Sequence, residues 1–369
     1  MISARIAWRV VAIAVALVGP LRAQAPPSLT DSAFAHLIAT LSEPPGYFDT
    51  DNLISNEDSY LHVVGTIKRL GVTGGAYIGV GPDQNYSYIA AIQPRVAFIV
   101  DIRRENMLEH VLFKSIFALA RNRLEYLCLL FGKPAPADTS GWSGPTIAAL
   151  IAHVDSTRAT AAVTARIKQQ VLDRAKRTLP ALSAQDLATI GRFHDAFITY
   201  GPALQFNSFG RSPQPYYPTF RRLLLETDRT GRQSSYLAHE ADFRIVKSLH
   251  ARNLIIPIVG DFGSPTALPA VGKWLRDHRE TVSAFYTSNV EQYLFRGGGF
   301  AQFASTVAEL PRNARTLMLR SYFLGDHPNT VAGYHAAQLA QYMDRFVALN
   351  AAGRLPGYRS LVMLDVIDQ

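Results

Sequence analysis

The sequence predicts an α/β fold with a doubly wound, mainly parallel sheet and a helical insertion. Nearly continuous apolar runs occur at 75–78 and 96–100, and further strand patterns at 254–261, 282–289 and 316–322. Such runs are typical of central parallel strands that are covered on both faces. Stretches with helical periodicity separate most of them, and strands that alternate with helices favour a parallel sheet.

The segment before the first strand, 26–74, is predicted to be a helical lead-in. Residues 31–41 have an amphipathic helical pattern, which ends at the Glu43-Pro-Pro-Gly sequence. Apolar residues recur at helical spacing again over 60–70, and Gly71 ends that pattern. Proline and glycine interrupt helices, so both boundaries have a physical cause.

The long segment 107–250 separates the second and third predicted strands. Its pattern is predominantly helical, which makes it an insertion that we expect to cover the strand ends. Within it, 206–218 contains three prolines and four aromatic residues and predicts an irregular loop of the kind that lines clefts. A helix over 330–349 and a last strand over 361–366 are expected to complete one α/β domain that spans 75–369.

The N-terminus has the features of an export signal. Arg5 and Arg9 precede an apolar run over 10–18, and small residues follow near Ala23. A positive flank, a short apolar segment and a small-residue exit predict a signal peptide over 1–25, cleaved near Ala23. The mature protein is then expected to be periplasmic or secreted. No later apolar run is long enough to predict an integral membrane segment.

Composition and motifs exclude several classes of function. The formal net charge is +8, but the basic residues are dispersed, so we expect no nucleic-acid partner. A single cysteine, Cys128, excludes an internal disulfide and a thiolate metal cluster, and its apolar surroundings predict a buried, inert thiol. The histidines show no metal-binding spacing, so no metal site is expected. The chain contains neither a phosphate-binding P-loop nor the nucleophile elbow of α/β-hydrolases.

A glycine-rich turn follows the first predicted strand. Gly79 and Gly81 would allow the backbone to approach a ligand closely, and a helix begins shortly afterwards. Asp101 ends the second strand, where a carboxylate could accept hydrogen bonds from ribose hydroxyls. The pattern predicts a nucleotide site at this edge of the sheet.

The residues that follow the strands resemble the class I S-adenosylmethionine-dependent methyltransferases, which have a Rossmann-like fold. By that resemblance Gly79 and Gly81 match the family's cofactor turn, and Asp101 matches the acid that holds the ribose. Asp261 then matches the adenine position and Asn289 the polar residue that faces the methyl donor. The resemblance covers 75–106 and 254–322, and implies methyl transfer from S-adenosylmethionine to an acceptor that the sequence does not identify.

The chain departs from that family at two positions. Tyr77 stands where the family has an acid, and Pro82 removes one N–H from the turn. NAD is disfavoured further, since Gln84 stands where a dinucleotide fingerprint needs glycine. S-adenosylmethionine is a cytosolic metabolite, which conflicts with export. The alternative is therefore an exported protein that binds a nucleotide or small ligand on the same fold without methyltransferase activity.

Three polar residues are candidates for chemistry. Glu57 and Glu291 are candidate general bases, and Asn289 directly follows a buried strand. The structural alternative is that Glu57 favours a helix dipole in a first helical turn. The phrases that begin at Ile54, Tyr77 and Phe285 also resemble a group of bacterial proteins to which no activity is attached, so they do not decide between an enzyme and a binding protein.

Overall fold

The computed structural model describes residues 28–368 except 211, 213 and 324. Its sheet has six strands in the order β3-β2-β1-β4-β5-β6. All neighbours pair in parallel except β5 and β6, which are antiparallel. The strands are β1 (Ala76–Gly79), β2 (Val96–Asp101), β3 (Ile255–Val259), β4 (Val282–Ser288), β5 (Leu317–Tyr322) and β6 (Ala337–Tyr342). The prediction of an α/β fold with a mainly parallel sheet is confirmed.

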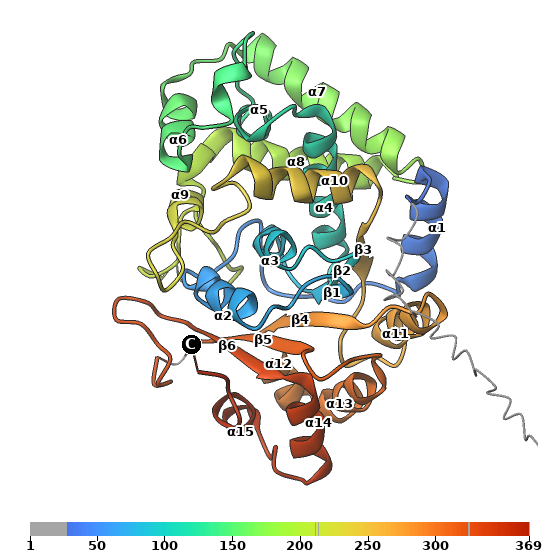
Figure 1. Ribbon diagram of the computed structural model, residues 1–369. Helices are drawn as coiled ribbons and strands as arrows, with labels where there is room; N and C mark the ends of the chain where they lie inside the picture. The colour runs from blue at the N-terminus through green and yellow to red at the C-terminus, as the bar shows by residue number, and fades with distance from the viewer. Residues whose placement is uncertain (1–27, 211, 213, 324, 369) are drawn as a thin grey trace, which may run out of the picture.

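Helices cover both faces of the sheet (Figure 1). The first half of the chain contains α1 (Asp31–Leu41), η1 (Tyr60–Val63), α2 (Val64–Arg69), α3 (Asn85–Ile92), α4 (Arg104–Leu119), α5 (Arg123–Leu130), η2 (Ser140–Trp142), α6 (Ile147–Ser156) and α7 (Ala161–Thr178). The second half contains α8 (Ala184–Tyr200), η3 (Gly201–Ala203), α9 (Phe220–Leu225), α10 (Glu240–Ala251), α11 (Ala267–Asp277), α12 (Val290–Gly297), α13 (Phe300–Glu309), α14 (Met343–Ala351) and α15 (Tyr358–Met363).

The central strands form the core because almost every side chain in them is apolar and buried. All residues of β1, β2, β3 and β5 are buried, as a parallel strand between two helical layers requires. The strand order reverses between β1 and β4: the chain proceeds outward through β2 and β3, then returns to build β4 and β5 on the other side. Ligands in open α/β sheets bind beyond the carboxyl ends of the strands at such a reversal.

Among the described residues of the insertion, only Phe206 and Ser208 line the cavity at the strand ends, so its helices do not cover those ends as expected. Its first helix, α4, packs on β2 and β3, its last helix, α10, packs on α3 and α4, and α7 and α8 pack on α4 farther from the sheet (Figure 1). The strand ends are covered chiefly by the lead-in segment 42–57, which we call the N-terminal strap. The Glu43 N–H donates to the carbonyl of Val259 at 3.0 Å, and the Gly46 N–H donates to the carbonyl of Ile102 at 2.8 Å. A Cβ on Gly46 would lie 2.6 Å from the Ile102 side chain, so glycine permits this crossing.

The prediction for the last hundred residues is partly wrong. The segment 361–366 does not form a strand, because α15 occupies Tyr358–Met363. The sixth strand is β6, which lies inside the segment expected to be helical, and α14 follows it directly. The sequence of β6 is rich in alanine and glutamine, so antiparallel pairing with β5 overrides its helical propensity.

Candidate functional site

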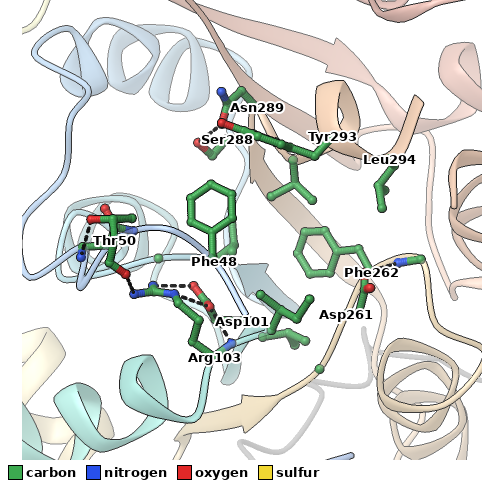
Figure 2. A pocket seen from close by; sticks show the side chains of 18 of the residues that line it. Phe48, Thr50, Asp101, Arg103, Asp261, Phe262, Ser288, Asn289, Tyr293 and Leu294 are labelled. Carbon is green, nitrogen blue, oxygen red and sulfur yellow. Dashed lines mark hydrogen bonds and ion pairs between the residues drawn. The ribbon is translucent and has the colours of Figure 1, made fainter. Parts of the chain in front are cut away.

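A cavity of about 550 Å³ lies beyond the carboxyl ends of β1 to β4, at the point of strand-order reversal. Its volume is in the range of small-molecule sites. Gly81, Asp101, Asp261 and Asn289, four of the five expected cofactor-binding residues, line it together. Figure 2 shows the last three around the cavity, with aromatic rings between them.

The turn after β1 is stabilised by a buried amide. Asn85 Nδ2 donates to the three backbone carbonyls of residues 80–82, at 2.9, 3.2 and 2.8 Å. Gly81 has φ of +81°, a conformation that glycine adopts without strain, and it borders the cavity. Gly79 does not line the cavity. A Cβ there would lie 2.0 Å from Asn85 Oδ1, so Gly79 accommodates the buried amide and does not approach a ligand.

The expected ribose acid, Asp101, forms a buried ion pair with Arg103. The Arg103 Nε and Nη2 donate to the two carboxylate oxygens at 3.1 and 3.0 Å, and the Arg103 backbone N–H donates to Oδ1 at 2.9 Å. Nη1 of the same arginine donates to the carbonyls of Thr50 and Asp51, which fastens the N-terminal strap to β2 (Figure 2). Arg103 is therefore buried, although it stands directly before the first residue of α4.

Asp261 borders the cavity at the end of β3. Its Oδ1 accepts a hydrogen bond from the Gly263 N–H at 2.8 Å, and its own N–H donates to Glu43 at 2.6 Å. The remaining oxygen, Oδ2, has no hydrogen bond among the described residues and can accept one from a ligand. Asn289 lines the cavity at the start of α12.

Aromatic side chains form the apolar walls of the cavity. Phe48 of the N-terminal strap meets Tyr293 edge to face, with 5.1 Å between ring centroids. Phe262 lies across the cavity from Phe48 (Figure 2). Phe206 and Ser208, from the loop expected to line a cleft, complete the mouth. Flat aromatic surfaces of this kind can hold a planar heterocycle.

Glu57 lies at the floor of the cavity and is 1% exposed. It accepts hydrogen bonds from Ser288 Oγ, from Tyr286 Oη at 2.5 Å and from Gln338 Nε2 at 3.2 Å. Burial raises the pKa of Glu57, and these hydrogen bonds oppose that shift by favouring the charged form. Ser288 has φ of +53°, which is unusual for a residue other than glycine, and the β4–β5 register shifts beside it. This irregularity at the end of β4 directs Ser288 to Glu57.

Glu291, the other candidate general base, is not part of the cavity. It is completely buried and accepts hydrogen bonds from Arg320 Nε at 2.9 Å and Thr287 Oγ1 at 2.8 Å. Its carboxylate neutralises a buried guanidinium and has no access to the ligand site. The structure therefore places Glu291 in an internal ion pair and not among the residues that line the cavity.

The sequence reasoning missed several lining residues. Phe48, Thr50 and Asn52 belong to the N-terminal strap, whose path depends on contacts with β2 and β3 that no local pattern encodes. The Asp-x-Arg spacing of Asp101 and Arg103 is the one sequence feature that indicates their ion pair, because side chains two residues apart after a strand end can meet.

The remaining predictions concern cysteine, metals and membranes. Cys128 is buried, and burial raises the pKa of its thiol to about 12, as expected for an inert residue. Within the described part of the chain, no group of three histidine, cysteine or acidic side chains is arranged to hold a metal. None of the helices in that part has the length and apolarity needed to cross a bilayer. The expected signal peptide lies outside the described residues.

The sheet and most of the cavity lie in a region that matches a known protein family. A family described as "Domain of unknown function (DUF7790)" matches residues 52–141 and 150–350. A comparison with curated proteins finds no match. The matched residues include all six strands and most of the cavity lining, among them Asp101 and Asn289. The chain therefore belongs to the DUF7790 family.

Proposed function

We propose that the cavity binds an S-adenosylmethionine-type nucleoside and that the protein is methyltransferase-like, with a Rossmann-like fold. The supporting observation is that Gly81, Asp101, Asp261 and Asn289 border one cavity at the strand-order reversal. The resemblance to the methyltransferases implies these four positions, which lie on four different segments, together with Gly79, which does not line the cavity.

The chemistry of the lining fits such a ligand. Asp101 Oδ2 accepts one hydrogen bond, from Arg103, and a carboxylate oxygen has capacity for a second, from a ribose hydroxyl. Asp261 Oδ2 can accept from an exocyclic amine. Phe48 and Phe262 offer apolar surface for a purine. When bound, the cofactor would supply an electrophilic methyl group on sulfur. The protein's contribution would be to orient the reactants and exclude water, which requires no catalytic dyad.

The alternative is a ligand-binding protein of the same fold without methyl transfer. The Asp101–Arg103 pair favours it, because a guanidinium occupies most of the acceptor capacity of the expected ribose acid. Export of the mature chain, which stays a prediction, would favour it too.

The test is calorimetric titration of the full chain with S-adenosylmethionine and S-adenosylhomocysteine, with NAD as the control ligand. We expect micromolar binding of the first two, weakened about tenfold or more by Asp101→Asn. Asp277→Asn, at an exposed acid on α11, is the matched control and should bind like wild type. If folded wild type binds none of these ligands, the proposed function is wrong. Binding that produces no methylated product from any acceptor tried would favour the alternative.

A further inference from the structure

The floor of the cavity contains a buried carboxylate without a cationic partner. Glu57 is 1% exposed, and the side chains that donate hydrogen bonds to it, Tyr286, Ser288 and Gln338, are all neutral. Among the described residues, no lysine, arginine or histidine nitrogen forms an ion pair with it. An ionised carboxylate in such a place is costly unless an opposite charge is close.

Two other buried acids near the strand ends do have a cation. Asp101 pairs with Arg103, and Glu291 pairs with Arg320 at 2.9 Å. In both pairs an arginine of the same chain lies beside the buried acid and compensates its negative charge. Glu57 borders the cavity, as Asp101 does, but it differs from both acids because no cation among the described residues pairs with its carboxylate.

A second acceptor lies next to Glu57. Gln84 is 6% exposed and lines the same cavity, and its Oε1 is buried with no hydrogen-bond partner. Its Nε2 donates to Tyr286 Oη at 3.4 Å, and that hydroxyl donates to Glu57. When Glu57 is ionised, the directions of these two hydrogen bonds are fixed, because the Tyr286 hydroxyl must donate its proton to the carboxylate and accept from Gln84 Nε2. The oxygen of Gln84 is then the atom left for a ligand. Most buried acceptors in proteins have a hydrogen-bond partner.

We propose that this floor, formed by Glu57 and Gln84, binds a protonated amine of the ligand. An ammonium group carries the missing positive charge and three N–H donors, which suits one carboxylate and one amide oxygen. The inference rests on the proposed function in that it takes the same cavity as the ligand site. The amine has two candidate sources: the amino-acid part of the nucleoside cofactor, or a separate acceptor molecule with a primary amine.

The experiment compares ligands that differ in the amine, using the full chain. S-adenosylhomocysteine carries an amino-acid group, and 5′-methylthioadenosine is the same nucleoside thioether without it. Butylamine and butanol are a matched pair of small probes, titrated with and without 5′-methylthioadenosine. Each ligand is titrated into wild type, Glu57→Gln, Gln84→Met and the control Glu109→Gln. Glu109 is a fully buried acid on α4 that does not line the cavity.

We expect Glu57→Gln to weaken amine-bearing ligands by about tenfold or more, while 5′-methylthioadenosine changes less than about twofold. Gln84→Met keeps the charge and should weaken the same ligands by several-fold, so it tests the site even if Glu57→Gln does not fold. Glu109→Gln should have no effect. If the Glu57 and Gln84 variants lose binding of S-adenosylhomocysteine alone, the amine belongs to the cofactor. If they lose binding of butylamine alone, the amine belongs to the acceptor.

The outcomes separate this inference from the proposed function. Equal binding of S-adenosylhomocysteine and 5′-methylthioadenosine, with no binding of butylamine, overturns the amine site and leaves the nucleoside site standing. Glu57-dependent binding of butylamine without any nucleoside binding supports the amine site and overturns the proposed function. Variants that weaken all ligands equally, or wild type that binds none, overturn the amine site.

Discussion

Breaking the Asp101–Arg103 pair should destabilise the protein strongly. The two residues are 5% and 4% exposed. Arg103→Met removes two side-chain hydrogen bonds to the carboxylate and two to the carbonyls of Thr50 and Asp51, and it leaves Asp101 buried without a cation. Loss of one partner of a buried pair costs about 3–5 kcal/mol. That is a large part of the roughly 5–15 kcal/mol that stabilises a typical domain.

The decisive quantity is the coupling free energy between Asp101 and Arg103, which is the difference between the double variant and the sum of the two single variants. Asp101→Leu should also cost about 3–5 kcal/mol, because it leaves the guanidinium buried and unpaired. The double variant Asp101→Leu with Arg103→Met removes both charges, so it should cost at least about 2 kcal/mol less than the sum of the single variants. Urea denaturation with a common m-value measures all three free energies of unfolding.

Two results would refute this reasoning. One is a decrease in the free energy of unfolding of less than about 1 kcal/mol for each single variant, which is the range measured for exposed ion pairs. The other is strict additivity, which would mean that the two side chains act independently. Asp101→Asn keeps the shape of the side chain but also leaves Arg103 without its anion, so its free energy of unfolding is measured in the same assay before its ligand binding is compared with wild type.

Three further predictions concern the surroundings of the site. Burial raises the pKa of Asp83 to about 7, so between about pH 4 and 7 the folded state retains a proton that the unfolded chain has lost. The free energy of unfolding should therefore fall by up to about 4 kcal/mol as pH rises from about 4 to 7. Asp83→Asn should flatten this pH dependence, as measured by urea denaturation across the same range. Parallel pH profiles would contradict this. Gly79→Ala places a methyl group 2.0 Å from Asn85 Oδ1 and should lower the free energy of unfolding by about 1–3 kcal/mol in the same assay, whereas Gly141→Ala, in open space, should change it by less than about 0.5 kcal/mol. Cys128, with its raised pKa and buried sulfur, should react with a thiol reagent at pH 8 only as fast as the protein unfolds, and immediate reaction in the native state would contradict its burial.

The central strands could be predicted because their side chains satisfy a strong local rule. Val96 to Val100 is apolar throughout, and an unbroken apolar run of this length is typical of a strand buried on both faces. The positions of Asp101 and Asn289 followed from this, since residues after parallel strands meet at one edge of the sheet. β6 was missed because it pairs at the sheet margin and its composition is helical in isolation.

The site was less predictable than the sheet because long-range contacts build it. The buried position of Arg103 depends on hydrogen bonds to carbonyls that lie about fifty residues earlier in the chain, which no local pattern predicts. The sequence identifies Glu57 as a polar candidate, but its isolation from every described cation appears only in three dimensions. Glu291 is also a glutamate close to a strand end, but it pairs with Arg320 inside the protein and does not border the cavity.

The N-terminal strap has a consequence for how the protein responds to a ligand. Its residues 46–52 are held by backbone hydrogen bonds, by Arg103 and by the Arg192–Asp51 ion pair, and none of their side chains belongs to the hydrophobic core. Segments of this kind open locally at a lower free energy than the sheet beneath them. A bound ligand that contacts Phe48 and Asn52 would oppose that opening, so amide hydrogen exchange should slow in 46–52 and 205–209 while the exchange of β1 and β2 stays unchanged. Occupancy of the cavity could therefore be read from the exchange rates of two short peptides, even before the ligand's identity is known.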